Sequence, residues 1–105
     1  MSVLQHTGPW TFDELADLPE DSLRYEVVDG NLVVTPPPTF DHQLVSNLLA
    51  QALARQAPGG WDVLVGCPLP LGTDGRVPDV AVVRKDAPQK PGPEFFGLVV
   101  EVVSR

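Results

Sequence analysis

The sequence Val-Pro-Asp-Val-Ala-Val-Val at residues 77–83 places one carboxylate, that of Asp79, at the head of a run of small and β-branched apolar residues. Such a run is typical of a strand buried within a sheet, and a proline fits at the beginning of a strand. An ionised carboxylate in apolar surroundings loses its hydration, so it needs a cation or a hydrogen-bond donor beside it. We therefore expect Asp79 to have a specific partner.

A second carboxylate has the same kind of neighbours. Glu101 lies within Leu-Val-Val-Glu-Val-Val at residues 98–103, which is also predicted to be a strand. Side chains alternate between the two faces of a strand, so Asp79 and Glu101 converge on one point if their strands are neighbours. Two hard oxygen ligands of this kind suit Mg²⁺ or Mn²⁺.

The same pattern also has a structural interpretation, which the spacing leaves open. Asp79 can cap a turn, and Glu101 can form an ion pair with an arginine. Three arginines are candidates for that pair: Arg24, Arg76 and Arg84.

Two further polar residues have both a structural and a functional interpretation. Glu26 alternates with apolar residues, which favours a solvated face of a hairpin, with a role as third metal ligand as the alternative. His42 stands near the start of a predicted helix, where it is either a surface residue or a contact for a phosphate or a water.

The first half of the chain predicts a short helix, a hairpin and a long helix. Thr11 and Glu14 form a capping box, and strands 24–28 and 31–35 flank Asp29-Gly30, a dipeptide suited to a type I′ turn. The long helix starts at Thr39 or Asp41 and ends before Pro58-Gly59-Gly60. Its predicted apolar stripe comprises Leu44, Val45, Leu48, Leu49, Ala52 and Leu53.

The second half predicts three strands, at 61–71, 77–84 and 95–103, with a turn at residues 72–75. The third strand is apolar on both faces apart from Glu101, which indicates a central strand covered above and below. A central strand needs neighbours, so we expect residues 1–105 to form a single domain that is the front portion of a longer one.

Composition excludes several classes of protein. The 105 residues carry a formal net charge of −7, which argues against strong non-specific binding of nucleic acid. No apolar run approaches the roughly 20 residues that a membrane helix requires, and residues 1–10 do not resemble a signal peptide. One cysteine and two histidines are too few for a structural zinc site. The single Cys67 cannot form an internal disulfide, so we expect a reducing cytoplasm.

Four segments together resemble a known family: Tyr25–Gly30, Pro37-Pro38 with His42 at the head of an amphipathic helix, Pro78–Val80 and Val99–Ser104. In order and spacing they are similar to the putative restriction endonuclease family, the Uma-type domain of unknown function, within the PD-(D/E)XK nuclease superfamily. The resemblance covers nearly the whole chain. It implies an α/β (α+β) restriction-endonuclease-like fold, with a mixed sheet and flanking helices.

The resemblance also implies a site and an activity. Asp79 and Glu101 would hold Mg²⁺ or Mn²⁺, and Glu26 would complete the acidic cluster. To these ligands our leading hypothesis adds the carbonyl of Val102. The implied activity is metal-dependent hydrolysis of DNA. The superfamily's usual lysine, two residues after the second acid, is replaced here by Val103, and the family's relocated lysine lies on a following helix. We therefore expect weak or no cleavage by this chain alone.

The absent lysine and the net negative charge favour an alternative function. In it, the chain is a non-enzymatic interaction module on a degenerate nuclease fold, whose exposed sheet pairs with itself or with a partner. This alternative predicts a homodimer or a larger oligomer.

Overall fold

The computed structural model describes residues 6–103 and has the expected α+β class, with one α-helix and two sheets. The chain forms two compact units, each built from two separate segments. Unit 1 comprises Met1–Pro37 and Pro70–Val77, and unit 2 comprises Pro38–Leu69 and Pro78–Arg105. None of the helices within residues 6–103 has the length and hydropathy needed to cross a bilayer.

The predicted hairpin organises unit 1. Strands β1 (Arg24–Val28) and β2 (Asn31–Thr35) pair antiparallel, with Val28 opposite Asn31 next to the turn. Asp29 and Gly30 have φ angles of 53° and 78°, as a type I′ turn requires. The Asp-Gly dipeptide therefore sets this register, as the sequence indicates.

Two short strands complete this sheet. Strands β4 (Leu69–Leu71) and β5 (Asp74–Arg76) give it the order β2-β1-β5-β4. The Asp74 carboxylate accepts the N–H groups of Asp29 and Gly30, at 2.8 and 3.3 Å, and so holds the hairpin turn from the neighbouring strand.

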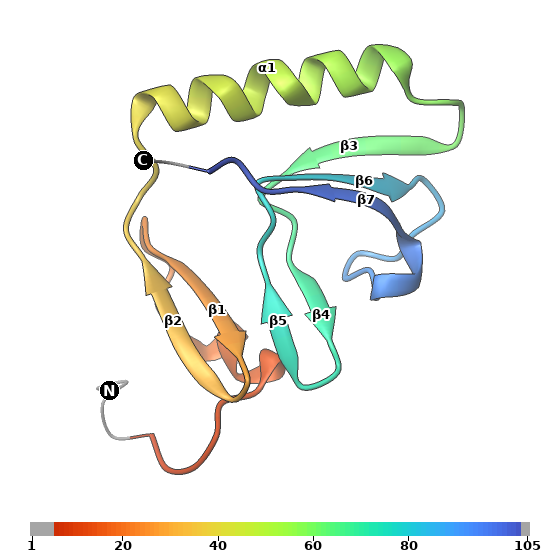
Figure 1. Ribbon diagram of the computed structural model, residues 1–105. Coiled ribbons are helices and arrows are strands. Elements are labelled where there is room, and N and C mark those ends of the chain that lie inside the picture. The colour runs from red at the N-terminus through yellow and green to blue at the C-terminus, as the bar shows by residue number, and fades with distance from the viewer. Residues whose placement is uncertain (1–5, 104–105) are drawn as a thin grey trace. The chain divides into compact units, whose positions relative to one another are not determined.

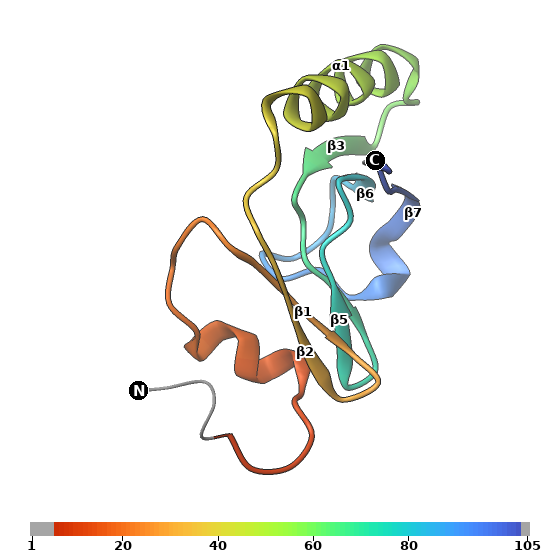
Figure 2. The ribbon, with the colours of Figure 1, turned by 60° about the vertical axis from the view of Figure 1, so that its left-hand side comes forward.

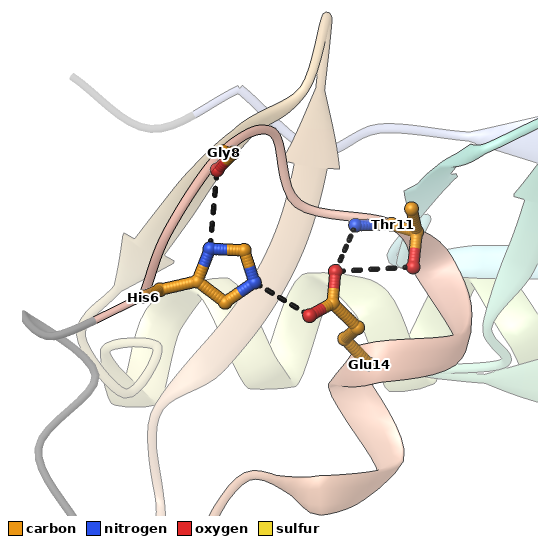
Figure 3. A network of polar contacts seen from close by, with 4 residues as sticks. All are labelled: His6, Gly8, Thr11 and Glu14. Carbon is orange, nitrogen blue, oxygen red and sulfur yellow. Dashed lines mark hydrogen bonds and ion pairs between the residues drawn. The ribbon is translucent and has the colours of Figure 1, made fainter.

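The first helix is a 3₁₀ helix, η2 (Phe12–Asp17), which packs on β1 and is drawn as the red-orange coil in Figures 1 and 2. The predicted capping box is present, because the Glu14 carboxylate accepts the Thr11 N–H at 2.9 Å. His6 adds a contact that the sequence did not suggest: its Nε2 donates to Glu14 at 2.5 Å (Figure 3). This hydrogen bond is the main reason that the pKa of Glu14 lies below its usual 4.5.

Unit 2 combines the long helix with a second sheet. Helix α1 (Phe40–Gln56) begins at Thr39, whose side chain accepts the His42 N–H at 3.2 Å, and it ends at Ala57, before Pro58. It lies along strand β3 (Trp61–Val65) and also contacts β6 (Val80–Arg84) (Figure 1).

The three-stranded sheet of unit 2 has the order β3-β6-β7, with β7 spanning Phe96–Val100 after a short 3₁₀ turn, η3 (Pro93–Phe95). Its central strand is β6, where Val80, Ala81 and Val83 are at most 2% exposed. The second neighbour and the cover that the sequence predicts for the last strand do not lie within the described residues. In residues 6–103 its one partner strand is β6, and Leu98 and Val99 are 47% and 42% exposed.

The strand predicted at 61–71 is interrupted, and the strand predicted at 77–84 begins later than expected, at Val80. Residues 66–68 separate β3 from β4, and residues 77–79 separate β5 from β6. Each interruption contains a proline, Pro68 or Pro78, which has no N–H to continue a ladder. Strand β4, from the outer part of the predicted strand 61–71, joins the sheet of unit 1. Strand β5, which begins inside the predicted turn at 72–75, joins the same sheet.

The predicted apolar stripe of α1 is only partly correct. Ser46 is buried and Leu49 and Leu53 are half-buried, whereas Leu44, Val45 and Leu48 are 45–54% exposed. The covered face is centred on His42 and Ser46, one turn apart, so it includes polar residues. The Ser46 hydroxyl is buried without a hydrogen-bond partner in the described part of the chain.

Strand β7 contains a β-bulge at Gly97. Val82 lies opposite Leu98 and Val83 opposite Phe96, so Gly97 is the extra residue. A Cβ at Gly97 would lie 2.7 Å from the Trp61 ring, which is closer than van der Waals contact allows. The glycine therefore makes room for the indole across the sheet.

We predict that Gly97→Ala destabilises the protein by about 1–3 kcal/mol, because the new methyl group displaces the Trp61 indole. Urea unfolding followed by tryptophan fluorescence measures the loss. Gly59→Ala is the matched control, since no atom lies within 4 Å of its added Cβ. Equal stability of the two variants would contradict this account of the bulge.

Candidate metal-binding site

The structure makes the strands that carry Asp79 and Glu101 neighbours. Val80 of β6 lies opposite Val100 of β7, so the next residues outward, Asp79 and Glu101, flank the same end of this strand pair. Their surroundings differ, because Asp79 is 8% exposed whereas Glu101 is an exposed residue.

Asp79 has the specific partner that its apolar setting requires. Its Oδ2 accepts the backbone N–H of Val102 at 2.6 Å. This bond links the residue before β6 to the segment that follows β7, beyond the last ladder pair. The hydrogen bond therefore fixes the orientation of the Asp79 carboxylate.

His42 lies at the same place. Its Nε2 is 3.1 Å from the Val102 carbonyl oxygen and 3.4 Å from Asp79 Oδ2, and its side chain is 15% exposed. The segment after β7 returns toward the first turn of α1, as Figure 1 shows in dark blue. The interpretation of His42 as a surface residue is therefore wrong, and the structure brings together His42, Asp79 and Val102.

The donor atoms of this cluster fit a hard divalent cation. A carboxylate oxygen of Asp79 and the carbonyl oxygen of Val102 both lie within 3.4 Å of one atom, His42 Nε2, so the two oxygens face a common point. Within residues 6–103, no three His, Cys, Asp or Glu side chains are placed to hold a metal together. An ion here would therefore depend on backbone oxygen and water as well, which is how Mg²⁺ is commonly held.

Glu26 belongs to unit 1. The sequence favoured a solvated face of the hairpin for this residue, but the structure buries it. It is 5% exposed, and its Oε2 accepts the Val77 N–H at 2.7 Å. Its Oε1 lies 3.8 Å from the Arg24 guanidinium. Glu26 therefore fastens the residue that follows β5 to strand β1.

Sequence reasoning missed the partners rather than the acids. The Val102 N–H carries no signal in a sequence, because every residue except proline has one. The signal available for His42 was its position at the start of α1, behind a Thr39 cap. The contact between His42 and Val102 spans 60 positions, which no local pattern reveals.

We predict that Glu26→Ala lowers the free energy of unfolding by about 1–2 kcal/mol, because the Val77 N–H then loses its acceptor. Glu26→Gln keeps an acceptor oxygen and retains most of the stability. Glu20→Ala removes an exposed carboxylate from the same unit and serves as the control. Urea unfolding measures all three, and a Glu26→Ala effect no larger than that of Glu20→Ala would contradict the assigned contact.

Comparison with solved structures identifies a protein of similar fold. The chain is similar to a crystal structure of a putative nuclease belonging to DUF820 from Anabaena variabilis, with a TM-score of 0.62 and 19% sequence identity. The match covers 80% of this chain and 50% of that chain, so this chain spans about half of the solved structure's length. At this identity the similarity shows the fold. Among curated proteins, none matched the sequence.

The family comparison extends over most of the chain. The model of the Uma2 family, described as "Putative restriction endonuclease", matches residues 12–105, which include Glu26, His42, Asp79, Glu101 and Val102. The chain therefore belongs to the Uma2 putative restriction endonuclease family.

Proposed function

We propose that this chain carries the metal-binding part of a DNA endonuclease that hydrolyses phosphodiester bonds. The observation that carries the proposal is the convergence of Asp79 Oδ2 and the Val102 carbonyl oxygen on one point at the end of β6 and β7. Membership of the Uma2 family supports the reaction class. In this proposal the ligands are the side chains of Asp79 and Glu101 and the carbonyl oxygen of Val102.

Each ligand has a distinct task. The buried Asp79 carboxylate supplies a negative charge, and the hydrogen bond from the Val102 N–H fixes its orientation. Glu101, at the exposed side of the same strand end, supplies the second charge where a DNA phosphate has access. A bound Mg²⁺ or Mn²⁺ supplies positive charge for the scissile phosphate and lowers the pKa of a coordinated water.

A cationic side chain that orients the attacking water is the part that the chain does not supply. Position 103, where the superfamily has a lysine, holds Val103. Of the two lysines in the sequence, Lys85 pairs with Asp62 at 2.5 Å. Lys90 lies in the proline-rich segment before η3. We therefore expect the 105-residue chain to bind a metal ion but to cleave DNA weakly or not at all.

The proposed cellular setting is the cytoplasm. Cys67, the single cysteine, has no second cysteine in the sequence with which to form an internal disulfide. Burial raises the pKa of its thiol, which lowers its reactivity.

We predict that Asp79→Asn weakens binding of Mg²⁺ or Mn²⁺ by about 10- to 100-fold while the fold is retained, because the amide oxygen still accepts the Val102 N–H. Glu101→Ala is expected to weaken binding as well. Isothermal titration calorimetry measures the affinities, and urea unfolding confirms that each variant is folded.

Two further variants complete the titration. Asp62→Ala removes an exposed carboxylate outside the site and should leave the affinity unchanged. Glu26→Gln tests the third acid that the resemblance implies. If the Asp79 and Glu101 variants bind metal as tightly as the unsubstituted chain, the proposed site does not exist.

A second candidate function is a non-enzymatic interaction module. It is favoured by the exposed apolar side chains of unit 2, which lie on α1 and β7 and comprise Leu44, Val45, Leu48, Leu98 and Val99. Burial of such side chains in an interface removes apolar surface from water and stabilises association.

The second candidate predicts a homodimer or larger oligomer at micromolar concentration. Light scattering coupled to gel filtration measures the mass, and Leu98→Lys on the edge strand β7 should return the chain to a monomer. A monomer at all concentrations for the unsubstituted chain would contradict self-association.

A further inference from the structure

The His42 imidazole occupies the point on which the two proposed ligand oxygens converge. Its Nε2 lies 3.1 Å from the Val102 carbonyl oxygen and 3.4 Å from Asp79 Oδ2. The three residues come from the first turn of α1, the residue before β6 and the segment after β7. A single side-chain nitrogen of α1 thus contacts groups from two other parts of unit 2.

The chemistry of the two oxygens determines what Nε2 must carry. A backbone carbonyl oxygen is an acceptor only, and so is an ionised carboxylate. A nitrogen that faces two acceptors contributes attraction only when it carries a hydrogen, so the partners assign the proton to Nε2. The positive end of the N–H dipole therefore points at the place where a cation would meet the same oxygens.

A cation and this N–H cannot share those oxygens. Mg²⁺ binds oxygen at about 2.1 Å, and the N–H hydrogen on the same side would lie within repulsive distance of it. Either His42 releases the oxygens when the ion binds, or it loses its hydrogen and becomes a ligand itself. Magnesium prefers oxygen to imidazole nitrogen, which favours release.

We propose that His42 is a stand-in for the cation: in the metal-free chain its Nε2–H holds the Asp79 carboxylate and the Val102 carbonyl, and it yields both when a divalent ion binds. The inference rests on the metal site of the proposed function and adds a device that regulates its affinity. His42 is a positioning residue here and not a ligand. Each binding event must break its hydrogen bond, so His42 lowers the affinity of the site.

An opposing effect has to be weighed. Removal of His42 could also let the two oxygens drift apart, which would weaken binding. The hydrogen bond from the Val102 N–H to Asp79 Oδ2, at 2.6 Å, is independent of His42 and continues to hold the Asp79 carboxylate beside Val102. Removal of His42 therefore increases the affinity for the metal ion, because the gain from losing a competing hydrogen bond exceeds the cost of a less ordered pair of ligand oxygens.

The test compares metal affinity in four forms of the chain at one fixed pH and ionic strength. Calorimetric titrations with Mg²⁺ and with Mn²⁺ are performed on the unsubstituted chain, His42→Ala, His42→Gln and His6→Ala. His42→Ala should bind about 2- to 10-fold more tightly, the gain expected when one net hydrogen bond no longer competes. His42→Gln, whose amide N–H reaches the same oxygens, should bind like the unsubstituted chain.

His6→Ala is the matched control for the loss of an imidazole, because His6 lies in unit 1 and contacts Glu14. It should leave the affinity unchanged. A second readout uses the unsubstituted chain alone: the ¹⁵N signals of the His42 ring should shift in proportion to Mg²⁺ occupancy, while the Val102 amide signal stays that of a hydrogen-bonded group.

The outcomes separate this inference from the proposed function. Metal binding that is weaker in both His42 variants would make His42 a ligand and overturn the stand-in role. Equal affinity in all four forms, or ring signals that do not respond to saturating Mg²⁺, would overturn it while the metal site stands. Absence of metal binding in every form would remove the site itself, and the inference with it. The ring signals decide the question even if His42→Ala does not fold.

Discussion

The antiparallel register of β6 on β7 is the constraint on which the rest of unit 2 depends. Val80 lies opposite Val100 in the last pair of this ladder. Asp79 therefore precedes β6 at the same end at which Glu101 and Val102 follow β7. The Asp79 carboxylate then takes the Val102 N–H, which extends the connection beyond the ladder. A slip of one residue would turn every side chain of one strand to the opposite face and separate these groups.

Local chemistry was enough to predict the hairpin and the long helix. Asp29-Gly30 determines its turn because both residues adopt positive φ angles, and Thr39 begins α1 because its side chain accepts an otherwise unpaired N–H. The strands of the second half were less predictable. The apolar run at 61–71 continues through Pro68, and the interruption of pairing there depends on which sheet each half joins.

The candidate site was predictable in its acids and not in their partners. Asp79 was identified because a buried carboxylate among valines is costly, and that reasoning is independent of the fold. The same reasoning did not identify Glu26 as buried. Alternation along a strand shows that Glu26 and its neighbours lie on opposite faces, but it does not show which face is covered. The sequence leaves His42 either at the surface or in contact with a phosphate or a water, because its partner Val102 is 60 positions away and no local pattern reveals that contact.

The boundaries between the two units have a consequence for how the chain assembles. The chain passes from one unit to the other three times, at Pro37-Pro38, Leu69-Pro70 and Val77-Pro78, and every passage involves a proline. Neither unit is therefore a continuous piece of polypeptide, and unit 1 closes only through contacts such as that between Asp29 and Asp74, which are 45 positions apart. Most of the intervening chain belongs to unit 2 and includes α1 and β3, and formation of these elements shortens the loop that must be closed and reduces the entropy lost on closure. The loop that closes the first sheet therefore contains the helix and a strand of the other unit.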